Sequence, residues 1–552
     1  MIQLGISAFY HDSAACIVEN GKVIAAAEEE RFTELKHDSS FPLNAIKYCL
    51  ESTNTSIDDI SEVCWYEDPA LKRDRVEKIF SKHPLRTFFT KKRFREEFAK
   101  NKPKRLLFDL GYKGKISYTP HHESHAAFSF FTSPYKSADI LVVDGVGEWQ
   151  TVSFWKGEGK ELKLKHSYKF PNSLGMFYST MTAFLGFKPN EGEYKVMGLA
   201  PYGNPGKYFD LLKSTIELTG FKVNQKFYTW EYTDKIMFNS KLAKLLDISP
   251  RLPEEEVTQD HKDLAASIQA VYEYFFLEFV HKMKLIGKSD NLCLGGGCAY
   301  NGVANYKAYK HYNNIHIPFA PSDAGSAIGA CLNNYRGPIK DNVSPYLGNS
   351  YTKEEYLDQI LANSDKVDFI EFTEEKLMNR VAKLLYSDKI VAWFQDRMEF
   401  GARALGNRSI LASPYNPKMR EKLNLVIKKR EGFRPFAPSV IEEDTTKYFL
   451  TKDKIPYMNQ VVKVKNGSLN KFPSATHIDG TARVQSVSKK QNERYYLLLD
   501  AFKRLSGHGV LLNTSFNLKD ETITRTPNQA IKRFLNSDID YLVLGNYLVL
   551  KK

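Results

Sequence analysis

The pattern of apolar and polar positions at the start of the chain predicts three short strands, at residues 2–9, 13–19 and 22–29. Asn20-Gly21, between the second and third of these strands, is a strong hairpin signal. A tight polar turn, Tyr10-His11-Asp12-Ser13, follows the first strand. Because turns at strand ends are where α/β proteins meet their ligands, this turn is a candidate binding segment.

The same pattern recurs in the middle of the chain. The stretch DILVVDGVGEW, residues 139–149, predicts a buried strand that runs into a turn at Asp144-Gly145, and two further strands follow around Gly157-Glu158-Gly159. Two such units with helices between them predict a duplicated α/β core with a ligand cleft between its halves. Helices are also predicted at residues 42–52, 261–285 and 375–387, with a last one from Thr526.

The length of the chain predicts more than one domain. With 552 residues it exceeds what a single hydrophobic core supports. A polar stretch from about residue 335 to 375 marks a boundary. We therefore predict an N-terminal domain at 1–345, a linker at 346–375 and a C-terminal domain at 376–552.

Composition and the absence of targeting signals favour a cytoplasmic protein. The six cysteines are sparse and form no CxxC pair, which favours reduced thiols. No apolar run is long enough for a membrane span, and no basic leader precedes an apolar run. The net charge of +13 favours anionic ligands or partners.

Much of the positive charge lies in residues 81–105, which predict a basic helix. A solvated face is the simpler interpretation of this helix, and contact with a nucleic acid or another polyanion is the alternative. Residues 204–258 are irregular and predict an insertion. Both segments are candidates for contacts with a substrate.

His121 and His125 are candidate metal ligands. They lie four residues apart on a predicted helix whose start is marked by Thr119-Pro120. One turn apart on one face, two imidazoles can hold one metal ion, although structural histidines also show this spacing. Asp323, at the start of a later predicted helix, is either a further ligand or a helix cap.

Two other stretches indicate anion binding. The turn Gly295-Gly296-Gly297 lies between an apolar strand and a helix, where backbone N–H groups can approach a phosphate. A tight packing turn would explain these glycines equally well. Between residues 397 and 434, dense Arg and Lys residues are interrupted by glycines and apolar residues. Converging cations of this kind fit phosphates or carbamate-like oxyanions.

Several motifs, in order and across nearly the whole chain, resemble one known family. They include GISAFYHDSAACIVENG, HHESHAAFSFF, LGGGCAYN, PSDAGSAIGA, RMEFGARALGNRSILASP and LLNTSFN. The sequence resembles the O-carbamoyltransferases of the nebramycin, cephamycin and NodU type. The resemblance implies an α/β protein with an N-terminal duplicated domain of the actin/hexokinase/Hsp70 type (Kae1-like) and a C-terminal YrdC-like α/β domain.

The resemblance also implies an activity. In the family, the YrdC-like domain makes carbamoyl adenylate from carbamoyl phosphate and ATP with Mg²⁺, and releases pyrophosphate. The Kae1-like domain then passes the carbamoyl group, near a ferrous ion, to a hydroxyl of a small-molecule or glycan acceptor. By this resemblance Fe²⁺ would be held by His121, His125 and Asp323, although the same ligand types also suit Zn²⁺ or Mn²⁺. The sequence does not identify the acceptor or the oligomeric state.

The family's functional positions fall on particular residues of this chain. His11 matches the histidine that acts on the acceptor hydroxyl, and an imidazole can accept that proton. Lys36 matches a basic residue of the same site. The positions expected to contact the nucleotide or carbamoyl adenylate in the Kae1-like domain are Asp144, Gly145, Gly295, Gly296, Gly297 and Asn301. The positions expected to hold carbamoyl phosphate and ATP are Arg403, Lys428, Arg434, Arg483 and Ser515.

Two alternative functions are less favoured. Enzymes of tRNA threonylcarbamoylation use the same two folds, and the net charge of +13 would suit tRNA. The stretches FGARALGNRSI and FRPFAPS, however, belong to the O-carbamoyltransferase pattern. A non-catalytic nucleotide-binding or sugar-kinase-like sensor would have decayed site positions, yet His11, His121 and Arg403 are present. A nucleic-acid partner is therefore the less favoured alternative.

Overall fold

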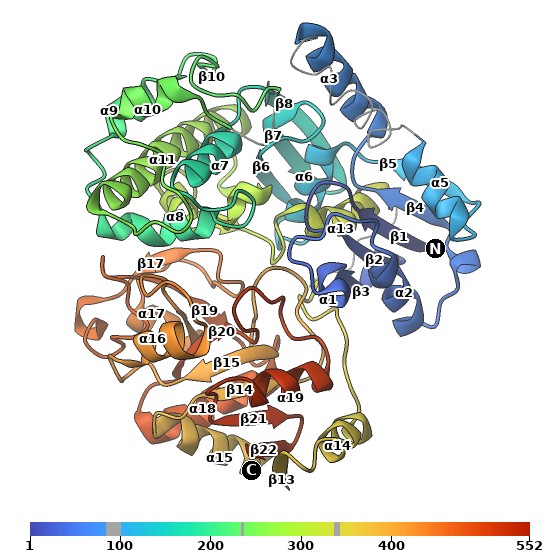
Figure 1. The fold of residues 1–552 in the computed structure, drawn as a ribbon. Coiled ribbons are helices and arrows are strands. Elements are labelled where there is room, and N and C mark those ends of the chain that lie inside the picture. The colour runs from blue at the N-terminus through green and yellow to red at the C-terminus, as the bar shows by residue number, and fades with distance from the viewer. Residues whose placement is uncertain (84–100, 233–236, 336–342) are drawn as a thin grey trace. The chain divides into compact units, whose positions relative to one another are not determined.

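The computed structural model describes residues 1–83, 101–232, 237–335 and 343–552 (Figure 1). The chain forms two compact units. Unit 1 comprises Met1–Glu29 and Ser39–Val343, and unit 2 comprises Glu30–Asp38 and Ser344–Lys552. Among the helices within these described ranges, none combines the length and apolar character that crossing a membrane requires.

Unit 1 is built on two five-stranded sheets with the same strand order. The first is ordered β3-β2-β1-β4-β5 and the second, taken from its other edge, β8-β7-β6-β11-β12. In each sheet the first strand in sequence pairs antiparallel with the strand that follows it and parallel with a later one. This repeated topology confirms the predicted duplicated α/β core of the actin/hexokinase type.

The strands of unit 1 are β1 Ile2–Ser7, β2 Ala14–Glu19, β3 Lys22–Glu28, β4 Glu62–Trp65, β5 Lys115–Tyr118, β6 Ser137–Val143, β7 Gln150–Glu158, β8 Glu161–Lys169, β9 Ile216–Glu217, β10 Lys222–Val223, β11 Asn291–Gly295 and β12 Asn314–His316. The predicted hairpin joins β2 to β3, where Asn20 and Gly21 both have positive φ, of 47° and 75°. This backbone geometry is what a two-residue hairpin turn requires, so the Asn-Gly signal is confirmed.

Two helices pack against each other between the sheets of unit 1. α6 (His121–Phe131) lies on β6 and β11, and α13 (Asp323–Asn334) lies on β1 and β2 (Figure 1). The two helices approach closely because α13 carries glycines. A Cβ atom on Gly329 would lie 2.0 Å from the carbonyl oxygen of Ser124 on α6. The GSAIGA sequence therefore allows the contact that brings the two helix starts together.

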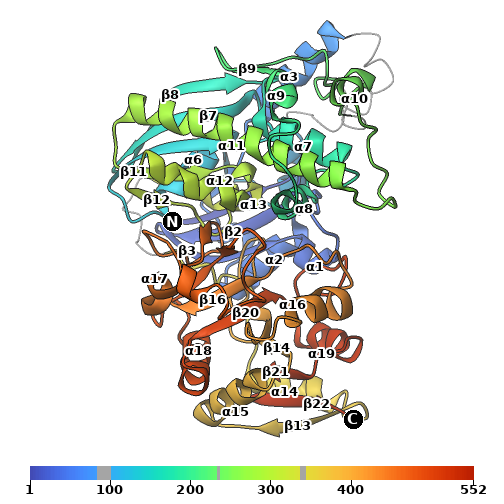
Figure 2. The same cartoon turned by 90° about the vertical axis from the view of Figure 1, so that its left-hand side faces the viewer.

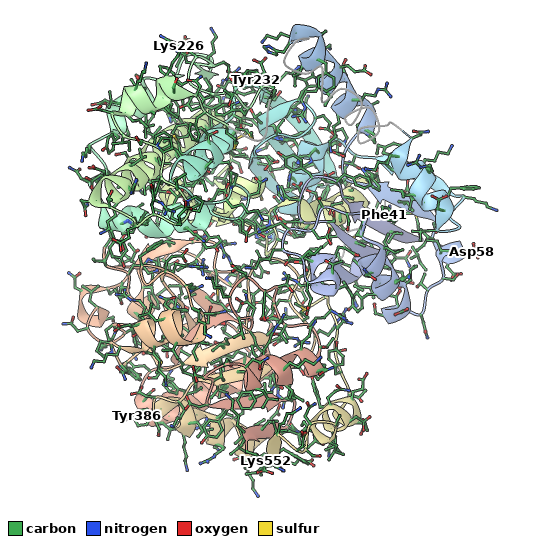
Figure 3. The ribbon with its side chains drawn as sticks, viewed as in Figure 1. Phe41, Asp58, Lys226, Tyr232, Tyr386 and Lys552 are labelled. Carbon is green, nitrogen blue, oxygen red and sulfur yellow. The ribbon has the colours of Figure 1, made fainter. Side chains whose placement is uncertain are left out.

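The remaining helices of unit 1 are α2 Leu43–Ser52, α3 Pro69–Lys82, α5 Lys102–Asp109, α7 Leu174–Phe184, α8 Glu193–Leu199, α9 Phe209–Lys213, α10 Ser240–Leu246, α11 Gln259–Gly287 and α12 Gly302–Lys307. Within the predicted insertion, α9 packs on α11 and on α10. Of the predicted basic helix, residues 84–100 lie outside the described residues. Phe41 packs beside Trp65 at the end of β4, with ring centroids 6.5 Å apart (Figure 3).

Unit 2 is an α/β domain around a mixed eight-stranded sheet, ordered β13-β22-β21-β14-β15-β20-β16-β19. The strands are β13 Val367–Glu371, β14 Val391–Phe394, β15 Arg408–Ala412, β16 Ala437–Ile441, β19 Gln485–Val487, β20 Val510–Ser515, β21 Tyr541–Leu544 and β22 Tyr547–Lys551, with β17 Val461–Lys463 and β18 Thr481–Arg483 forming a separate pair. An α/β fold is what the resemblance implied for this part of the chain.

The helices of unit 2 are α1 Glu30–Thr33, α14 Lys353–Leu361, α15 Glu374–Tyr386, α16 Met419–Glu421, α17 Thr445–Tyr448, α18 Glu493–Ser506 and α19 Pro527–Leu535. α15 and α18 pack together on one face of the sheet (Figure 2). The core beneath them contains Trp393, Tyr495 and Phe502, all fully buried. Tyr386, at the end of α15, stays exposed at the edge of this layer (Figure 3).

The predicted linker at 346–375 is wrong, because this stretch contains α14 and β13. β13 pairs antiparallel with β22 at the edge of the eight-stranded sheet. Four of its five residues are exposed, the apolar Phe369 and Ile370 among them, and this short strand lies within a largely polar stretch, which is why the sequence resembles a linker. The boundary between the two units also does not lie at a single position in the sequence. Residues 30–38 belong to unit 2, where Arg31 donates from Nη2 to the carbonyl oxygen of Gly401 at 3.0 Å.

Candidate active site

Four buried side chains of unit 1 converge where α6, α13 and the end of β6 meet. α6 presents His121 and His125, whose Nε2 atoms are 3.1 Å apart. Asp144, directly after β6, places Oδ2 3.0 Å from Nε2 of His121. Asp323, at the start of α13, places Oδ1 3.5 Å from Nε2 of His121 and 3.4 Å from that of His125. The structure thus brings together the three predicted ligands and adds Asp144.

The donor set of this His/Asp cluster (His121, His125, Asp144 and Asp323) fits a metal ion. One ligand atom from each side chain lies within 4.8 Å of all the others. Both carboxylate oxygens of Asp323 are buried and accept no hydrogen bond from any described residue. A buried carboxylate without donors is costly, and a cation would remove that cost. Separations of about 3–3.5 Å are those expected between ligand atoms bound at about 2.1 Å from one ion.

The capping alternative for Asp323 is wrong. Its carboxylate accepts no hydrogen bond from the first turn of α13, and Ser322 occupies the N-cap position. The side chain points instead to the two imidazoles of α6, as the distances above show. A residue at a helix start that leaves the free N–H groups unused is better explained as a ligand than as a cap.

Surrounding groups fix the orientation of the cluster. His125 contacts the Oγ of Ser326 through Nδ1 at 3.0 Å. The backbone N–H of Gly297 donates to Oδ1 of Asp144 at 3.0 Å, which leaves Oδ2 for the cluster. The backbone N–H of His121 donates to Oε1 of Glu148 at 2.9 Å. Partners of this kind hold the rings and carboxylates in the orientation that a metal ion needs.

The electrostatics of the cluster also favour a cation. Burial would lower the pKa of His121, but the charge of Asp323 and the hydrogen bond to Asp144 outweigh it and raise this pKa to about 9. Burial would raise the pKa of Asp144, yet the hydrogen bond to His121 and the nearby His125 hold it well below its ordinary value. The two carboxylates therefore create a negative field that positive charge relieves.

The glycine turn after β11 serves the cluster through its backbone. Gly296 has a φ of 87°, and a Cβ atom there would lie 2.2 Å from the carbonyl oxygen of Val143. Only glycine fits this close approach. Asn301 caps α12 by accepting from the N–H of Ala304 at 3.2 Å. The tight packing alternative thus accounts for these positions, and their contact with a nucleotide stays a prediction.

His11 lies in the predicted turn after β1. Its Nδ1 is 3.0 Å from Oδ2 of Asp12, and its Nε2 forms no hydrogen bond within the described ranges. Burial would lower the pKa of His11, but the charges of Asp323 and Asp12 outweigh it and raise this pKa to about 10. The neighbouring Tyr10 hydroxyl would lie 3.8 Å from a Cβ atom on Gly145, the residue after Asp144, so the turn lies beside the His/Asp cluster in unit 1.

Lys36 belongs to unit 2, as do the other residues 30–38. Its charge is one of the causes that lower the pKa of Lys428, after burial and the charges of Arg430 and Arg434. The sequence grouped Lys36 with His11, whereas the structure groups it with the cations of the second unit. Long-range hydrogen bonds decide this, such as that from Nε of Arg525 to the carbonyl oxygen of Arg31 at 3.1 Å.

Arg403, Arg434 and Arg483, which were predicted to hold carbamoyl phosphate and ATP, form one group of cations with Arg430 in unit 2. Burial and the charges of Arg403, Arg430 and Arg434 hold the pKa of Arg483 well below its ordinary value. The Nε of Arg483 is buried and has no hydrogen-bond partner among the described residues. Arg434 pairs with Glu431 at 3.4 Å. Four guanidinium groups that repel one another are ready to bind an oxyanion.

Lys428 and Ser515 are brought together, but Lys428 is already engaged. Its Nζ donates to the carbonyl oxygens of Ser515 at 2.7 Å and Asn517 at 2.8 Å, and to Oδ1 of Asn517 at 2.9 Å. An ammonium group has three donors, and all three are used here. Ser515 Oγ donates to Oδ1 of Asn517 at 2.6 Å. Lys428 therefore fixes the Ser515–Asn517 turn and contributes charge to the group.

Sequence reasoning missed three features of these sites. Asp144 was assigned to nucleotide binding, and its distances to His121 and His125 show its place in the His/Asp cluster. Arg430 was noticed among the dense cations and not assigned to the site. His477 was not singled out, although its Nε2 is buried without a partner among the described residues and Arg483 affects its pKa. A histidine next to a turn, in HIDGTAR, was the available signal.

Comparisons with known proteins show the family of this chain. The model for the carbamoyltransferase N-terminus matches residues 2–332, and that for the carbamoyltransferase C-terminus matches residues 382–551. An uncharacterized protein of Synechocystis sp. is 40% identical over 99% of this chain and 96% of its own length. Nodulation protein NolNO of Sinorhizobium fredii is 35% identical over 99% of this chain and 79% of its own length.

The name of a further relative states an enzymatic activity. The 3'-hydroxymethylcephem-O-carbamoyltransferase of Amycolatopsis lactamdurans is 32% identical over 46% of this chain and 48% of its own length. Together the two family models cover most of the chain, and the resemblance found in its motifs is confirmed. The chain therefore belongs to the carbamoyltransferase family and is an enzyme that transfers a carbamoyl group.

Proposed function

We propose that this enzyme forms carbamoyl adenylate from carbamoyl phosphate and ATP in unit 2 and transfers the carbamoyl group to an acceptor hydroxyl in unit 1. The observation that carries the proposal is the cation group around Arg483, whose buried Nε has no hydrogen-bond partner among the described residues and whose pKa is lowered by burial and by the charges of Arg403, Arg430 and Arg434. Such a group is suited to bringing two anionic substrates together. The acceptor is a hydroxyl-bearing small molecule or glycan, by analogy with the cephem O-carbamoyltransferase among the relatives.

The first reaction makes demands that the residues of unit 2 can meet. For atoms to balance, water hydrolyses carbamoyl phosphate to carbamate and inorganic phosphate, and a carbamate oxygen then attacks the α-phosphorus of ATP and displaces pyrophosphate. Both substrates are polyanions that repel each other in water. Arg403 and Arg483 would neutralise them, and Mg²⁺ accompanies the ATP. The backbone at Ser515–Asn517, fixed by Lys428, would orient a phosphate oxygen.

The second reaction is supported by the geometry around His11. Asp12 holds the imidazole through Nδ1, which leaves Nε2 to accept the proton of the acceptor hydroxyl as its oxygen attacks the carbamoyl carbon. AMP then leaves. Neutralising Asp323 and Asp144 would lower the raised pKa of His11 toward the range in which imidazole accepts a proton.

A divalent metal belongs to this proposal, and Fe²⁺ is the expected ion. His121, His125, Asp144 and Asp323 would hold it, and when bound it would supply positive charge near the phosphate or carbonyl oxygen. The ligand types also suit Mn²⁺ or Zn²⁺. Glu148 and Ser326 would keep His121 and His125 in place whichever ion is present.

The first reaction can be tested without knowing the acceptor. The enzyme is incubated with ATP, Mg²⁺ and carbamoyl phosphate, and the release of pyrophosphate and inorganic phosphate is followed. We expect both products in equal amounts, strongly reduced in Arg403→Ala and Arg483→Gln and retained in His121→Ala. Arg504→Gln is a matched control, because Arg504 is an exposed residue of α18 paired with Asp500. Equal release by wild type and both arginine variants would contradict the proposal.

The same assay distinguishes the alternative function. If pyrophosphate is released with threonine and bicarbonate instead of carbamoyl phosphate, the enzyme belongs to the chemistry of tRNA threonylcarbamoylation. Release with carbamoyl phosphate alone supports O-carbamoyl transfer, and the search then turns to hydroxyl acceptors.

A further inference from the structure

α3 carries a buried guanidinium without a partner. Arg75 is 8% exposed, and its Nε is enclosed with no hydrogen bond among the described residues. Within the same described ranges it forms no ion pair, and it lies against the ring of Phe170, 5.3 Å from the ring centroid. A charge withdrawn from water without a partner is costly, and such a charge is retained where a ligand supplies the partner.

Other buried cations of unit 1 are satisfied. Lys72, three residues earlier on α3, donates to Oε1 of Glu67 at 2.9 Å. Arg251 donates from Nε to the carbonyl oxygen of Leu185 at 2.6 Å and from Nη1 to that of Pro253 at 3.3 Å. Burial by itself therefore does not explain why Arg75 has no hydrogen-bond or ion-pair partner among the described residues. The guanidinium that resembles it is Arg483, in the group proposed to bind anionic substrates.

Tyr10 connects Arg75 to the His/Asp cluster. Nζ of Lys72, three residues before Arg75 on α3, lies 5.9 Å from the centroid of the Tyr10 ring, so Tyr10 lies beside α3. Burial and the charge of Asp144 raise the pKa of Tyr10, and the charge of Arg75 lowers it. A Cβ atom on Gly145 would lie 3.8 Å from the Tyr10 hydroxyl. The ring centroids of Tyr10 and His11 are 5.0 Å apart. Like Arg75, the Tyr10 hydroxyl has no hydrogen bond to the residues that the structure describes.

The acids near Arg75 are engaged by other donors. Glu67 accepts from Lys72, as given above. Oε1 of Glu148 accepts from the backbone N–H groups of Asp68 at 2.8 Å and His121 at 2.9 Å. These carboxylates contribute to the field at Arg75 from a distance and leave its N–H groups available. A planar guanidinium with free donors matches the two oxygens of a phosphate, sulfate or carboxylate.

We infer that Arg75, with the hydroxyl of Tyr10, forms an oxyanion-binding subsite beside the His/Asp cluster of unit 1. This inference rests on the proposed function, because the oxyanion is carried by a molecule that takes part in carbamoyl transfer. Two such molecules have the required chemistry. One is carbamoyl adenylate, through its phosphate, and the other is an acceptor with an anionic group. Arg75 would hold either one with its reacting atom toward His11.

The test uses inorganic sulfate as the probe and isothermal titration calorimetry on the full chain. Sulfate is a tetrahedral dianion that binds guanidinium groups and coordinates metals weakly. We expect wild type to show a sulfate site whose affinity falls about 10- to 100-fold in Arg75→Gln, since charge-assisted hydrogen bonds are lost. Arg73→Gln is the matched control, because Arg73 lies on the exposed side of the same helix and pairs with Glu77 at 2.6 Å.

The second arm distinguishes the two sources of the oxyanion. If Arg75 binds the phosphate of the adenylate, AMP will compete with sulfate for the Arg75-dependent site and will itself bind more weakly to Arg75→Gln. If Arg75 binds an anionic group of the acceptor, sulfate will bind to this site in the presence of saturating AMP. Either result supports the subsite.

Superimposable sulfate isotherms for wild type, Arg73→Gln and Arg75→Gln would overturn the inference. If Arg75→Gln does not fold, Arg75→Lys replaces it, and a single ammonium should give an intermediate loss of affinity. An affinity for sulfate in Arg75→Lys equal to that of wild type would then overturn it. Pyrophosphate release with carbamoyl phosphate is measured in wild type and in the control Arg73→Gln, so failure of the proposed function is recognised separately.

Discussion

At the scale of single residues, the most informative side chain is Asp323. Sequence alone left it as a cap or a ligand, and helix starts are common places for aspartate. The structure favours a ligand, because both carboxylate oxygens are buried and accept no hydrogen bond from the described residues. A cation is the partner that this arrangement lacks, and the two histidines of α6 complete its ligands.

We expect Asp323→Asn to lose most of its metal affinity while keeping its fold, because the amide has the same shape and lacks the charge. Titration calorimetry with Mn²⁺, with metal content measured after purification, should show a loss of at least about tenfold to 100-fold, the size seen even for outer-shell changes. Asp58→Asn is the control, because Asp58 is an exposed acid far from the cluster in sequence. Wild-type metal affinity in Asp323→Asn would show that the carboxylate is not a ligand.

At the scale of elements, the turn between β11 and α12 holds Asp144 through the backbone. Gly296 permits this with a positive φ and a close approach to Val143. Gly296→Ala should therefore displace the turn, destabilise unit 1 by about 3 kcal/mol or more and weaken metal binding. The measurement is thermal unfolding together with the Mn²⁺ titration.

A matched glycine separates backbone strain from the close contact. Gly159 also has a positive φ, of 59°, but a Cβ atom there meets nothing within 4 Å. Gly159→Ala should cost about 1 kcal/mol and leave metal binding intact. Equal effects of the two substitutions would show that the contact with Val143 has no role.

A second prediction at this scale concerns the edge strand β12. Burial lowers the pKa of His316 to about 4, whereas an unfolded histidine titrates near 6.5. Between these values only the unfolded chain is protonated, so stability is lost as pH falls from 6.5 to 4 and levels off below. Because His316 is partly exposed, we expect its titration to reduce the free energy of unfolding by about 2 kcal/mol over this pH range.

His316→Gln should therefore flatten the decline of the urea-unfolding midpoint between pH 6.5 and 4.5. The glutamine can keep a contact with the hydroxyl of Thr132, which lies 3.3 Å from Nε2 of His316. His281→Gln, on the exposed side of α11, is the control. If the two variants show the same pH dependence as wild type, His316 does not link acid to unfolding.

At the scale of the whole molecule, the sequence predicted local features more completely than contacts between residues far apart in the chain. The two strand–turn–hairpin units, the Asn20-Gly21 hairpin and the helix that begins at His121 were all predicted, because each depends on residues close together in sequence. Asp323 joins the cluster through the packing of α13 on α6, and these two helices are far apart in the chain. No pattern within the sequence could show that contact.

The errors at domain scale have the same cause. β13 is a short, exposed edge strand within a largely polar stretch, so its sequence resembles part of a linker. Residues 30–38 follow a strand of unit 1 directly, yet Arg31 and Glu34 form hydrogen bonds with residues 370 to 495 positions away. Arg75 was missed because a lone arginine on a charged helix looks like a surface residue until its burial is known.

The account as a whole assigns different chemistry to the two units, and the most direct test is to detect the intermediate. Enzyme, ATP, Mg²⁺ and carbamoyl phosphate are mixed without acceptor, and carbamoyl adenylate is identified by mass spectrometry in wild type, His121→Ala and Arg483→Gln. The account predicts carbamoyl adenylate in wild type and His121→Ala and little or none in Arg483→Gln. Its absence in wild type, or equal amounts in Arg483→Gln, would contradict the account.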